Sequence, residues 1–206
     1  MIAIIDYGVG NLFSLVSSFK AIGADALITN DVDTIKRADK IILPGVGAFE
    51  DAAKKLRDSG LDKVVLDEVA KGKPLMGICL GMQLLFKHSY EYGCHEGLGL
   101  IDADILPFEG KLASELKIPH IGWNALKIEN KDCPLFKYLK DGDHVYFVHS
   151  YFAEKGIAEC ATSAEYGIDF TAAVWKNNIY GCQFHPEKSG DVGLNILRGF
   201  CEIGEN

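Results

Sequence analysis

Short apolar runs alternate with helical segments along the first half of the chain, and this alternation constrains the fold more than any other feature. The runs IAII (2–5) and PLMGI (74–78) are apolar throughout, and KIIL (40–43) is apolar after Lys40, which is typical of strands buried on both faces. Apolar residues recur at helical spacing between them, as in segments 12–22 and 49–73. Because strands that alternate with helices form βαβ units, the sequence predicts a mostly parallel central sheet flanked by helices.

The pattern changes in the second half, where strand-like segments follow one another with short turns between them. These segments are 101–108, 120–128, 144–152, 158–166, 170–177 and 179–184. Helical spacing is found at 80–88 and again in a last segment, 192–201. The sequence therefore predicts an α/β fold with additional antiparallel or mixed strands in its C-terminal half. With 206 residues and no linker or internal repeat, residues 1–206 are expected to form a single domain.

The composition is acidic and limits the possible partners. With 21 basic and 29 acidic residues, the formal net charge is −8, which argues against a nucleic-acid or anionic membrane surface. No apolar run approaches the ~20 residues that span a bilayer, and the N-terminus MIAIIDYG lacks the basic region of a signal peptide. The six cysteines have no CxxC spacing, as expected of reduced thiols. We therefore expect a cytoplasmic protein with no nucleic-acid or membrane partner.

Three segments resemble cofactor or metal motifs without matching them. In DYGVGNLF the third glycine of a dinucleotide fingerprint would fall on Phe13, and in GLGLID it would fall on Asp102, so both are interpreted as turns. Cys94, His95 and Glu96 are potential metal ligands, but adjacent positions do not have metal-binding spacing. A polar loop is the preferred interpretation there. The sequence predicts no cofactor and no metal site.

Cys79 lies between Gly77 and Gly81, where an apolar run ends and a helical one begins. This layout is that of a nucleophile elbow with sulfur in place of oxygen. The glycines relieve crowding in a sharp strand-to-helix turn, and the free N–H groups at a helix start favour the reactive thiolate. A packed core cysteine explains the same residues, so the motif alone leaves both interpretations open.

A cysteine nucleophile needs a base, and His185 is the strongest candidate among the histidines. It follows the strand-like segment 179–184, and Glu187 can hold its imidazole in the tautomer that faces a thiol. A solvated turn with a chance acid beside a histidine is the alternative. His120 and His149 lie at or near the ends of strand-like segments and could line a cleft. The remaining histidines lie in or beside polar segments and are expected at the surface: His88, His95 and His144.

The loop LPGVGAFED (43–51) follows the third predicted strand and contains two glycines. A loop at the C-terminal edge of a parallel sheet can present backbone N–H groups to an anion, as an oxyanion hole requires. A plain glycine-rich turn between a strand and a helix is the alternative, and the segment by itself favours that interpretation.

Taken together, these motifs resemble those of the class I (triad) glutamine amidotransferases. GICLGMQ (77–83) is followed about a hundred residues later by QFHPE (183–187), as in the catalytic triad of that family. DYGVGN, LPGVGAF, IPHIGWN and YFVHSYF are similar to segments of the glutaminase subunits of imidazole glycerol phosphate synthase. The resemblance covers nearly the whole chain in order, with no departure at the catalytic positions.

The resemblance implies a role for each matching residue. Cys79 would attack the carboxamide of glutamine and form a γ-glutamyl thioester, His185 would move a proton to the departing ammonia, and Glu187 would orient His185. The oxyanion would be met by backbone N–H groups of three residues: Val46, Gly47 and Leu80. The amino-acid end of glutamine would be contacted by Gln83 and by the backbones of Ser150 and Tyr151.

The resemblance also implies a partner, a (β/α)8-barrel cyclase subunit that uses the ammonia to make imidazole glycerol phosphate and aminoimidazole carboxamide ribotide in histidine biosynthesis. Trp123, Tyr146 and Lys188 lie in motif loops beside the expected site and could anchor such a partner, although Trp123 could also be a strand-end core residue. The alternative is a paralogous glutaminase subunit that supplies ammonia to a sugar-amidinating synthase of surface-polysaccharide synthesis. This chain alone does not separate the two.

Overall fold

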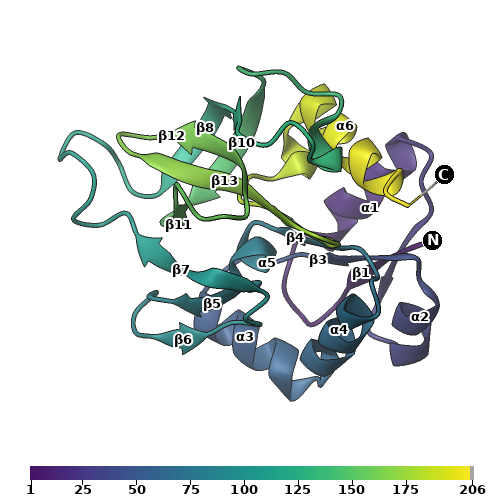
Figure 1. The fold of residues 1–206 in the computed structure, drawn as a ribbon. Coiled ribbons are helices and arrows are strands. Elements are labelled where there is room, and N and C mark those ends of the chain that lie inside the picture. The colour runs from purple at the N-terminus through teal and green to yellow at the C-terminus, as the bar shows by residue number, and fades with distance from the viewer. Residues whose placement is uncertain (205–206) are drawn as a thin grey trace.

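A twelve-stranded sheet forms the centre of the molecule, and helices cover both faces of its parallel half (Figure 1). The structure is a computed structural model that describes residues 1–204. In spatial order, the parallel strands are β2 (Ala26–Thr29), β1 (Ile2–Ile5), β3 (Lys40–Leu43), β4 (Leu75–Ile78) and β14 (Ile179–Cys182). All except the edge strand β2 are buried along their whole length, as the apolar runs predict.

Two layers of helices pack on this parallel half. One layer contains α1 (Leu12–Ala21) and α6 (Gly190–Cys201), and the other contains α2 (Val32–Arg37), α3 (Phe49–Asp58) and α4 (Leu61–Ala70). Phe19 of α1 and Phe200 of α6 are fully buried against one face of the sheet, and Val65 of α4 is fully buried against the other. The apolar stripes predicted from helical spacing therefore face the sheet.

Beyond β14 the sheet becomes mainly antiparallel. Its further strands are, in spatial order, β13 (Asp169–Lys176), β11 (Tyr151–Glu154), β7 (Ile101–Pro107), β5 (Phe86–Ser89) and β6 (His95–Glu96), with β12 (Cys160–Glu165) and β9 (Lys127–Ile128) joined through β13. A separate antiparallel pair consists of β8 (His120–Ala125) and β10 (His144–His149), and two short 3-10 helices are η1 (Pro134–Phe136) and η2 (Pro186–Lys188). The predicted α/β class, with added strands in the C-terminal half, is confirmed.

The helix predicted over residues 80–88 is wrong beyond its first turn. α5 (Leu80–Gln83) is followed directly by strand β5. The carbonyl oxygens of residues 84–86 accept hydrogen bonds from the backbone of segment 98–101 instead of from a continuing helix. The side chains of residues 84–86 are all buried, which is typical of a strand in the core and not of an amphipathic helix.

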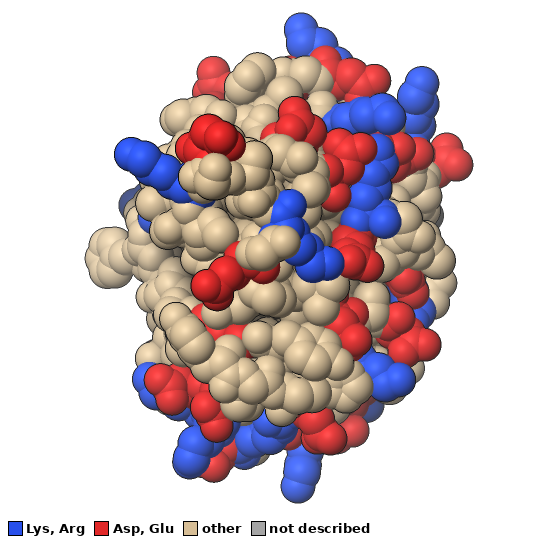
Figure 2. All heavy atoms as spheres, turned by 90° about the vertical axis from the view of Figure 1, so that its left-hand side faces the viewer, with Lys and Arg blue, Asp and Glu red and all other residues tan. Residues whose placement is uncertain are grey.

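Charged side chains of both signs are interspersed on the face that carries the ends of β6, β7 and β12 (Figure 2). Blue and red residues alternate there, and the basic ones do not gather in one patch. Among the described residues, no helix is both long enough and apolar enough to cross a membrane.

Candidate active site

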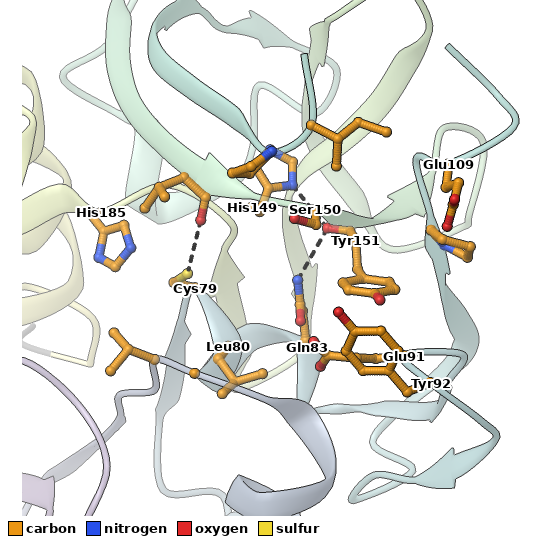
Figure 3. A pocket seen from close by; sticks show the side chains of 16 residues that line it. Cys79, Leu80, Gln83, Glu91, Tyr92, Glu109, His149, Ser150, Tyr151 and His185 are labelled. Carbon is orange, nitrogen blue, oxygen red and sulfur yellow. Dashed lines mark hydrogen bonds between the residues drawn. The ribbon is translucent and has the colours of Figure 1, made fainter.

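The C-terminal ends of three neighbouring parallel strands, β3, β4 and β14, lie beside a cavity of about 620 Å³. Each of these strands is followed by one of the predicted catalytic segments, which contain Gly47, Cys79 and His185. Because parallel strands end at the same edge of a sheet, segments that are far apart in the sequence meet there. All three residues line the cavity, and Figure 3 shows Cys79 and His185 beside each other on its wall.

Cys79 lies in a strained turn between β4 and α5. Its φ of 55° and ψ of −114° are rarely adopted by residues other than glycine. A Cβ added to Gly81 would lie 1.9 Å from the carbonyl oxygen of Leu43, and one added to Gly77 would lie 2.6 Å from that of Gly81. Both glycines therefore relieve crowding in the turn, as the sequence predicts. Since α5 is a single turn, the helix dipole expected at Cys79 is limited to that turn.

His185 and Glu187 are buried side by side at the start of η2. Their side chains are 3% and 2% exposed, and Nδ1 of His185 lies 2.8 Å from Oε1 of Glu187. A carboxylate accepts this hydrogen bond, so Nδ1 carries the proton and Nε2 is left for Cys79. Burial opposes the charged imidazole, but the hydrogen bonds and charges of Cys79 and Glu187 raise the pKa of His185 to about 10. This burial excludes the alternative of a solvated turn.

Two groups that the sequence did not single out contact the Cys79 thiol. The carbonyl oxygen of Val148 lies 4.0 Å from Sγ, and Nε2 of Gln183 lies 3.8 Å from it. Gln183 follows β14 directly and is fully buried. The only feature of the sequence that could have indicated this contact is that Gln183 belongs to the QFHPE segment, which also contains His185. Together with His185, these groups surround the thiol with polar partners.

The loop after β3 begins at a carbonyl held by a buried tyrosine. The hydroxyl of Tyr7 donates to the carbonyl oxygen of Pro44 over 2.6 Å. Burial, with Cys79 nearby, raises the pKa of Tyr7 above its usual range, so the hydroxyl keeps its proton. The predicted oxyanion residues line the cavity with Cys79: Val46, Gly47 and Leu80. Their part in meeting an oxyanion stays a prediction.

The predicted substrate-binding residues line the same cavity: Gln83, Ser150 and Tyr151. Nε2 of Gln83 donates to the carbonyl oxygen of Tyr151 over 3.2 Å and to Oε1 of Gln183 over 2.9 Å. These two bonds hold the Gln83 side chain against the cavity wall, and Figure 3 shows the one to Tyr151. Contact with glutamine stays a prediction for all three residues.

Two acidic residues and a tyrosine complete the cavity wall on the side away from Cys79 (Figure 3). They are Glu91, Tyr92 and Glu109. Oε2 of Glu91 accepts a hydrogen bond from the backbone N–H of Phe49, the first residue of α3, over 2.6 Å. Sequence reasoning missed these residues because they lie in polar loops, where a cavity carboxylate has the same local pattern as a surface one. Carboxylates at this position can bind an ammonium group.

The remaining histidines divide into a buried pair and three more exposed residues. His149 lines the cavity, whereas His120 is buried behind it, so the expectation that both could line a cleft is correct only for His149. His144 is exposed, while His88 and His95 are partly buried. Within residues 1–204, no group of three or more His, Cys, Asp or Glu side chains is placed to hold a metal ion.

The three residues predicted to contact a partner lie together beside the cavity. The rings of Trp123 and Tyr146 meet edge to face with centroids 6.2 Å apart, and Nζ of Lys188 is 5.9 Å from the centroid of Tyr146. Trp123 is 57% exposed and Ile121 58% exposed, so the interpretation of Trp123 as a core residue is wrong. Ile121 pairs with the cavity residue Val148. We call Ile121, Trp123, Tyr146 and Lys188 the aromatic surface.

The fold and this site define a class of proteins. The family model described as "Glutamine amidotransferase class-I" matches residues 3–202. A crystal structure of a glutamine amidotransferase superposes with a TM-score of 0.77 at 19% identity and covers 100% of both chains. PurLQS from Thermotoga maritima superposes with a TM-score of 0.75 at 20% identity and covers 98% of this chain and 97% of its own. At these identities the structural similarity concerns the fold alone.

Sequence relatives narrow the class further. The imidazole glycerol phosphate synthase subunit HisH of Caldanaerobacter subterraneus is 49% identical over 206 residues, 98% of each chain. The protein of the same name from Geobacter metallireducens is 47% identical over 205 residues, 97% of this chain and 96% of the relative. The chain therefore belongs to the class I glutamine amidotransferase family and, within it, to the imidazole glycerol phosphate synthase subunits HisH. The resemblance drawn from the motifs is confirmed.

Proposed function

We propose that the chain hydrolyses glutamine to glutamate and ammonia as the glutaminase subunit of an imidazole glycerol phosphate synthase in histidine biosynthesis. The observation that carries this proposal is the convergence of the strained Cys79 turn and the buried His185–Glu187 pair on one cavity. Membership in the HisH family supports the pathway. The same membership does not favour the alternative, a subunit that serves a sugar-amidinating synthase.

Cys79 is the nucleophile and His185 the acid and base. With His185 protonated, Cys79 attacks as the thiolate on the carboxamide carbon of glutamine, and the carbonyl π electrons move to its oxygen. The tetrahedral intermediate collapses when His185 donates its proton to the departing nitrogen, which leaves as ammonia and gives a γ-glutamyl thioester. His185, now neutral, takes a proton from water. The resulting hydroxide attacks the thioester and releases glutamate and the thiolate.

The oxyanion of each tetrahedral intermediate is stabilised by backbone N–H groups. Leu80 supplies one from the start of α5, and the Val46–Gly47 peptide supplies the other. Both segments line the cavity with Cys79, which supports this assignment. Donors of this type act on charge that develops only in the transition state, so they accelerate the reaction more than they strengthen substrate binding.

The amino-acid end of glutamine occupies the opposite side of the cavity. Its carboxylate is bound near the Ser150–Tyr151 backbone and Gln83, and its ammonium group is bound near Glu91 and Glu109. Charge complementarity supports this orientation, because the two acidic side chains lie away from Cys79 (Figure 3). The orientation places the carboxamide of glutamine at the thiol.

The ammonia passes to a (β/α)8-barrel cyclase subunit that docks on the aromatic surface. Exposed aromatic side chains next to a positive charge are typical of protein interfaces, and this group adjoins the cavity through Val148. The cyclase makes imidazole glycerol phosphate and aminoimidazole carboxamide ribotide. Residues 1–206 act as one domain. The cytoplasm is the proposed compartment because Cys79, Cys94, Cys133, Cys160 and Cys182 form no disulfide bond.

The proposal is tested by measuring glutamate release in the complex with a cognate barrel cyclase and its nucleotide ligand. Cys79→Ala removes the nucleophile, so we expect a loss of about 10⁴-fold or more. Cys94→Ala removes an exposed thiol and is expected to retain full activity. If the wild-type complex releases glutamate no faster than Cys79→Ala, the glutaminase assignment is wrong. If release is stimulated only by a sugar-amidinating synthase, the pathway is wrong instead.

A further inference from the structure

His120 and His149 form a buried pair that the catalytic mechanism does not use. They lie directly opposite each other in β8 and β10, and Nδ1 of His120 is 3.0 Å from Nε2 of His149. Four aromatic side chains pack against their rings: Phe108, Phe147, Tyr166 and Phe170. A hydrogen bond between two imidazoles in such apolar surroundings requires a defined placement of their protons.

The carbonyl oxygen of Tyr151 fixes that placement. It lies 2.9 Å from Nδ1 of His149, and because a carbonyl only accepts, this nitrogen carries a proton. Burial lowers the pKa of His149 to about 3 and that of His120 to about 4, so both rings are neutral. Nε2 of His149 therefore accepts from Nδ1 of His120. Nε2 of His120 is left as an acceptor that faces Nδ2 of Asn124 at 3.5 Å.

Each group in this series donates to the next one: Asn124 to His120, His120 to His149, and His149 to the Tyr151 carbonyl. The series ends at the substrate cavity, which Tyr151 lines. The Tyr151 carbonyl at its end also accepts from Nε2 of Gln83 over 3.2 Å. Figure 3 shows His149 and Gln83 meeting at this carbonyl from two sides. Besides the backbone bond from Phe108 to Ser150 and the pairing with β7, the Ser150–Tyr151 backbone is therefore held by two side-chain donors, and one of them is aligned by His120.

We propose that His120 is a positioning residue for glutamine binding. It holds His149 in the tautomer that donates to the Tyr151 carbonyl, and His149 thereby fixes the Ser150–Tyr151 backbone and Gln83 against the amino-acid end of the substrate. This inference rests on the proposed function. His120 touches neither Cys79 nor the cavity, so its loss affects binding of glutamine more than the bond-making steps.

Two substitutions separate the hydrogen bond from the packing of the ring. His120→Phe keeps a ring stacked between Phe147 and Tyr166 but removes the donor to His149. His120→Asn loses the ring but places an amide N–H near the position of Nδ1. In the complex with the cyclase subunit, we expect His120→Phe to raise KM for glutamine about tenfold, with kcat within about twofold of wild type. His120→Asn is expected to keep KM closer to the wild-type value despite a lower Tm.

If His120 acted through packing alone, His120→Asn would have the higher KM for glutamine and His120→Phe the lower. The inference is overturned if His120→Phe keeps the wild-type KM, or if KM rises in both variants in step with the fall in Tm. Should His120→Phe not fold, Asn124→Leu removes the last donor of the same series and is expected to raise KM by about threefold; an unchanged KM there also overturns the inference. A wild-type complex that releases no glutamate contradicts the proposed function instead.

Discussion

The two halves of the sheet contribute different parts of the site. The parallel half supplies the groups proposed to react, because β3, β4 and β14 lead into the proposed oxyanion loop (residues 43–51), Cys79 and His185. The antiparallel half supplies the groups around them. We count the separate pair β8–β10 with this half. Strand β11 carries Tyr151 and β10 carries His149 toward the cavity, and β8 carries Trp123 on the exposed face.

The two halves also differ in what holds these groups in place. In the parallel half, backbone packs directly on backbone, as where Gly81 approaches Leu43 and leaves no room for a side chain. In the antiparallel half, side-chain hydrogen bonds such as those of His149 and Gln83 to the Tyr151 carbonyl set the geometry. The comparison teaches that the turn carrying Cys79 is fixed by packing of the main chain, whereas the cavity wall around Tyr151 is fixed by side chains.

The largest expected effect comes from filling the contact at Gly81. Gly81→Ala places a methyl group against the carbonyl oxygen of Leu43, and we expect it to lower the free energy of unfolding by about 4 kcal/mol or more. Gly72→Ala is the matched control, since φ there is +95° but nothing lies within 4 Å of the added Cβ. It should lose only about 1–2 kcal/mol through backbone strain. Equal losses in urea unfolding of the two variants would contradict backbone packing as the cause.

The next largest effect is expected when the negative charge of Glu187, which stabilises protonated His185, is removed. Glu187→Gln keeps an acceptor for Nδ1 but removes the negative charge, so the pKa of His185 should fall below its value of about 10. We expect kcat in the complex to fall about 100-fold, the lower end of what general acid–base catalysis contributes. The exposed ion-pair partner Glu154 gives the control Glu154→Gln, which should have wild-type kcat.

The pH dependence of stability follows from the same shift. The folded-state pKa of His185 is raised from 6.5 to about 10, so the stabilisation from its partners is fully present below pH 6.5 and is lost as the pH rises through 10. In Glu187→Gln this loss should occur at lower pH. An NMR titration of the imidazole measures the shift directly, and an unchanged pKa would show that Glu187 does not hold the charge.

The same division explains how much could be predicted from the sequence. The parallel strands, and the candidate residues Cys79, His185 and Glu187 that meet beside the cavity, were predictable because each is a local pattern: an apolar run, Gly-x-Cys-x-Gly, or His-x-Glu. Strand β5 was mistaken for helix because the partner of its backbone lies in segment 98–101. Gln183 and Tyr7 were missed for a related reason. Their partners Gln83 and Pro44 are 100 and 37 residues away, so no local pattern reports the contact.

The aromatic surface gives a third test, at the outer face of the antiparallel half. Trp123→Ala removes a large exposed ring beside Tyr146, and we expect Kd for the cyclase subunit to rise about 30-fold, or about 2 kcal/mol. At saturating cyclase, kcat should be unchanged because Trp123 does not line the cavity. Tyr138→Ala, which removes an exposed tyrosine bound to Glu202, is the control. Calorimetric titration with the cyclase subunit measures Kd for both variants. If Trp123→Ala binds the cyclase as tightly as Tyr138→Ala does, Trp123 is not part of the interface.

The smallest effect is expected at Tyr7, whose hydroxyl holds the first part of loop 43–51 through the Pro44 carbonyl. Tyr7→Phe leaves the buried Pro44 carbonyl without this donor, and we expect about 1 kcal/mol less stability in urea unfolding. Tyr138→Phe is the control for loss of a hydroxyl at the surface. Because the close contact of Gly45 with Gly81 remains, the loop should keep its course and KM should stay at the wild-type value. If Tyr7→Phe raised KM as much as His120→Phe is expected to, side-chain hydrogen bonds would position the site residues of both halves. The proposed difference between the halves would then be wrong.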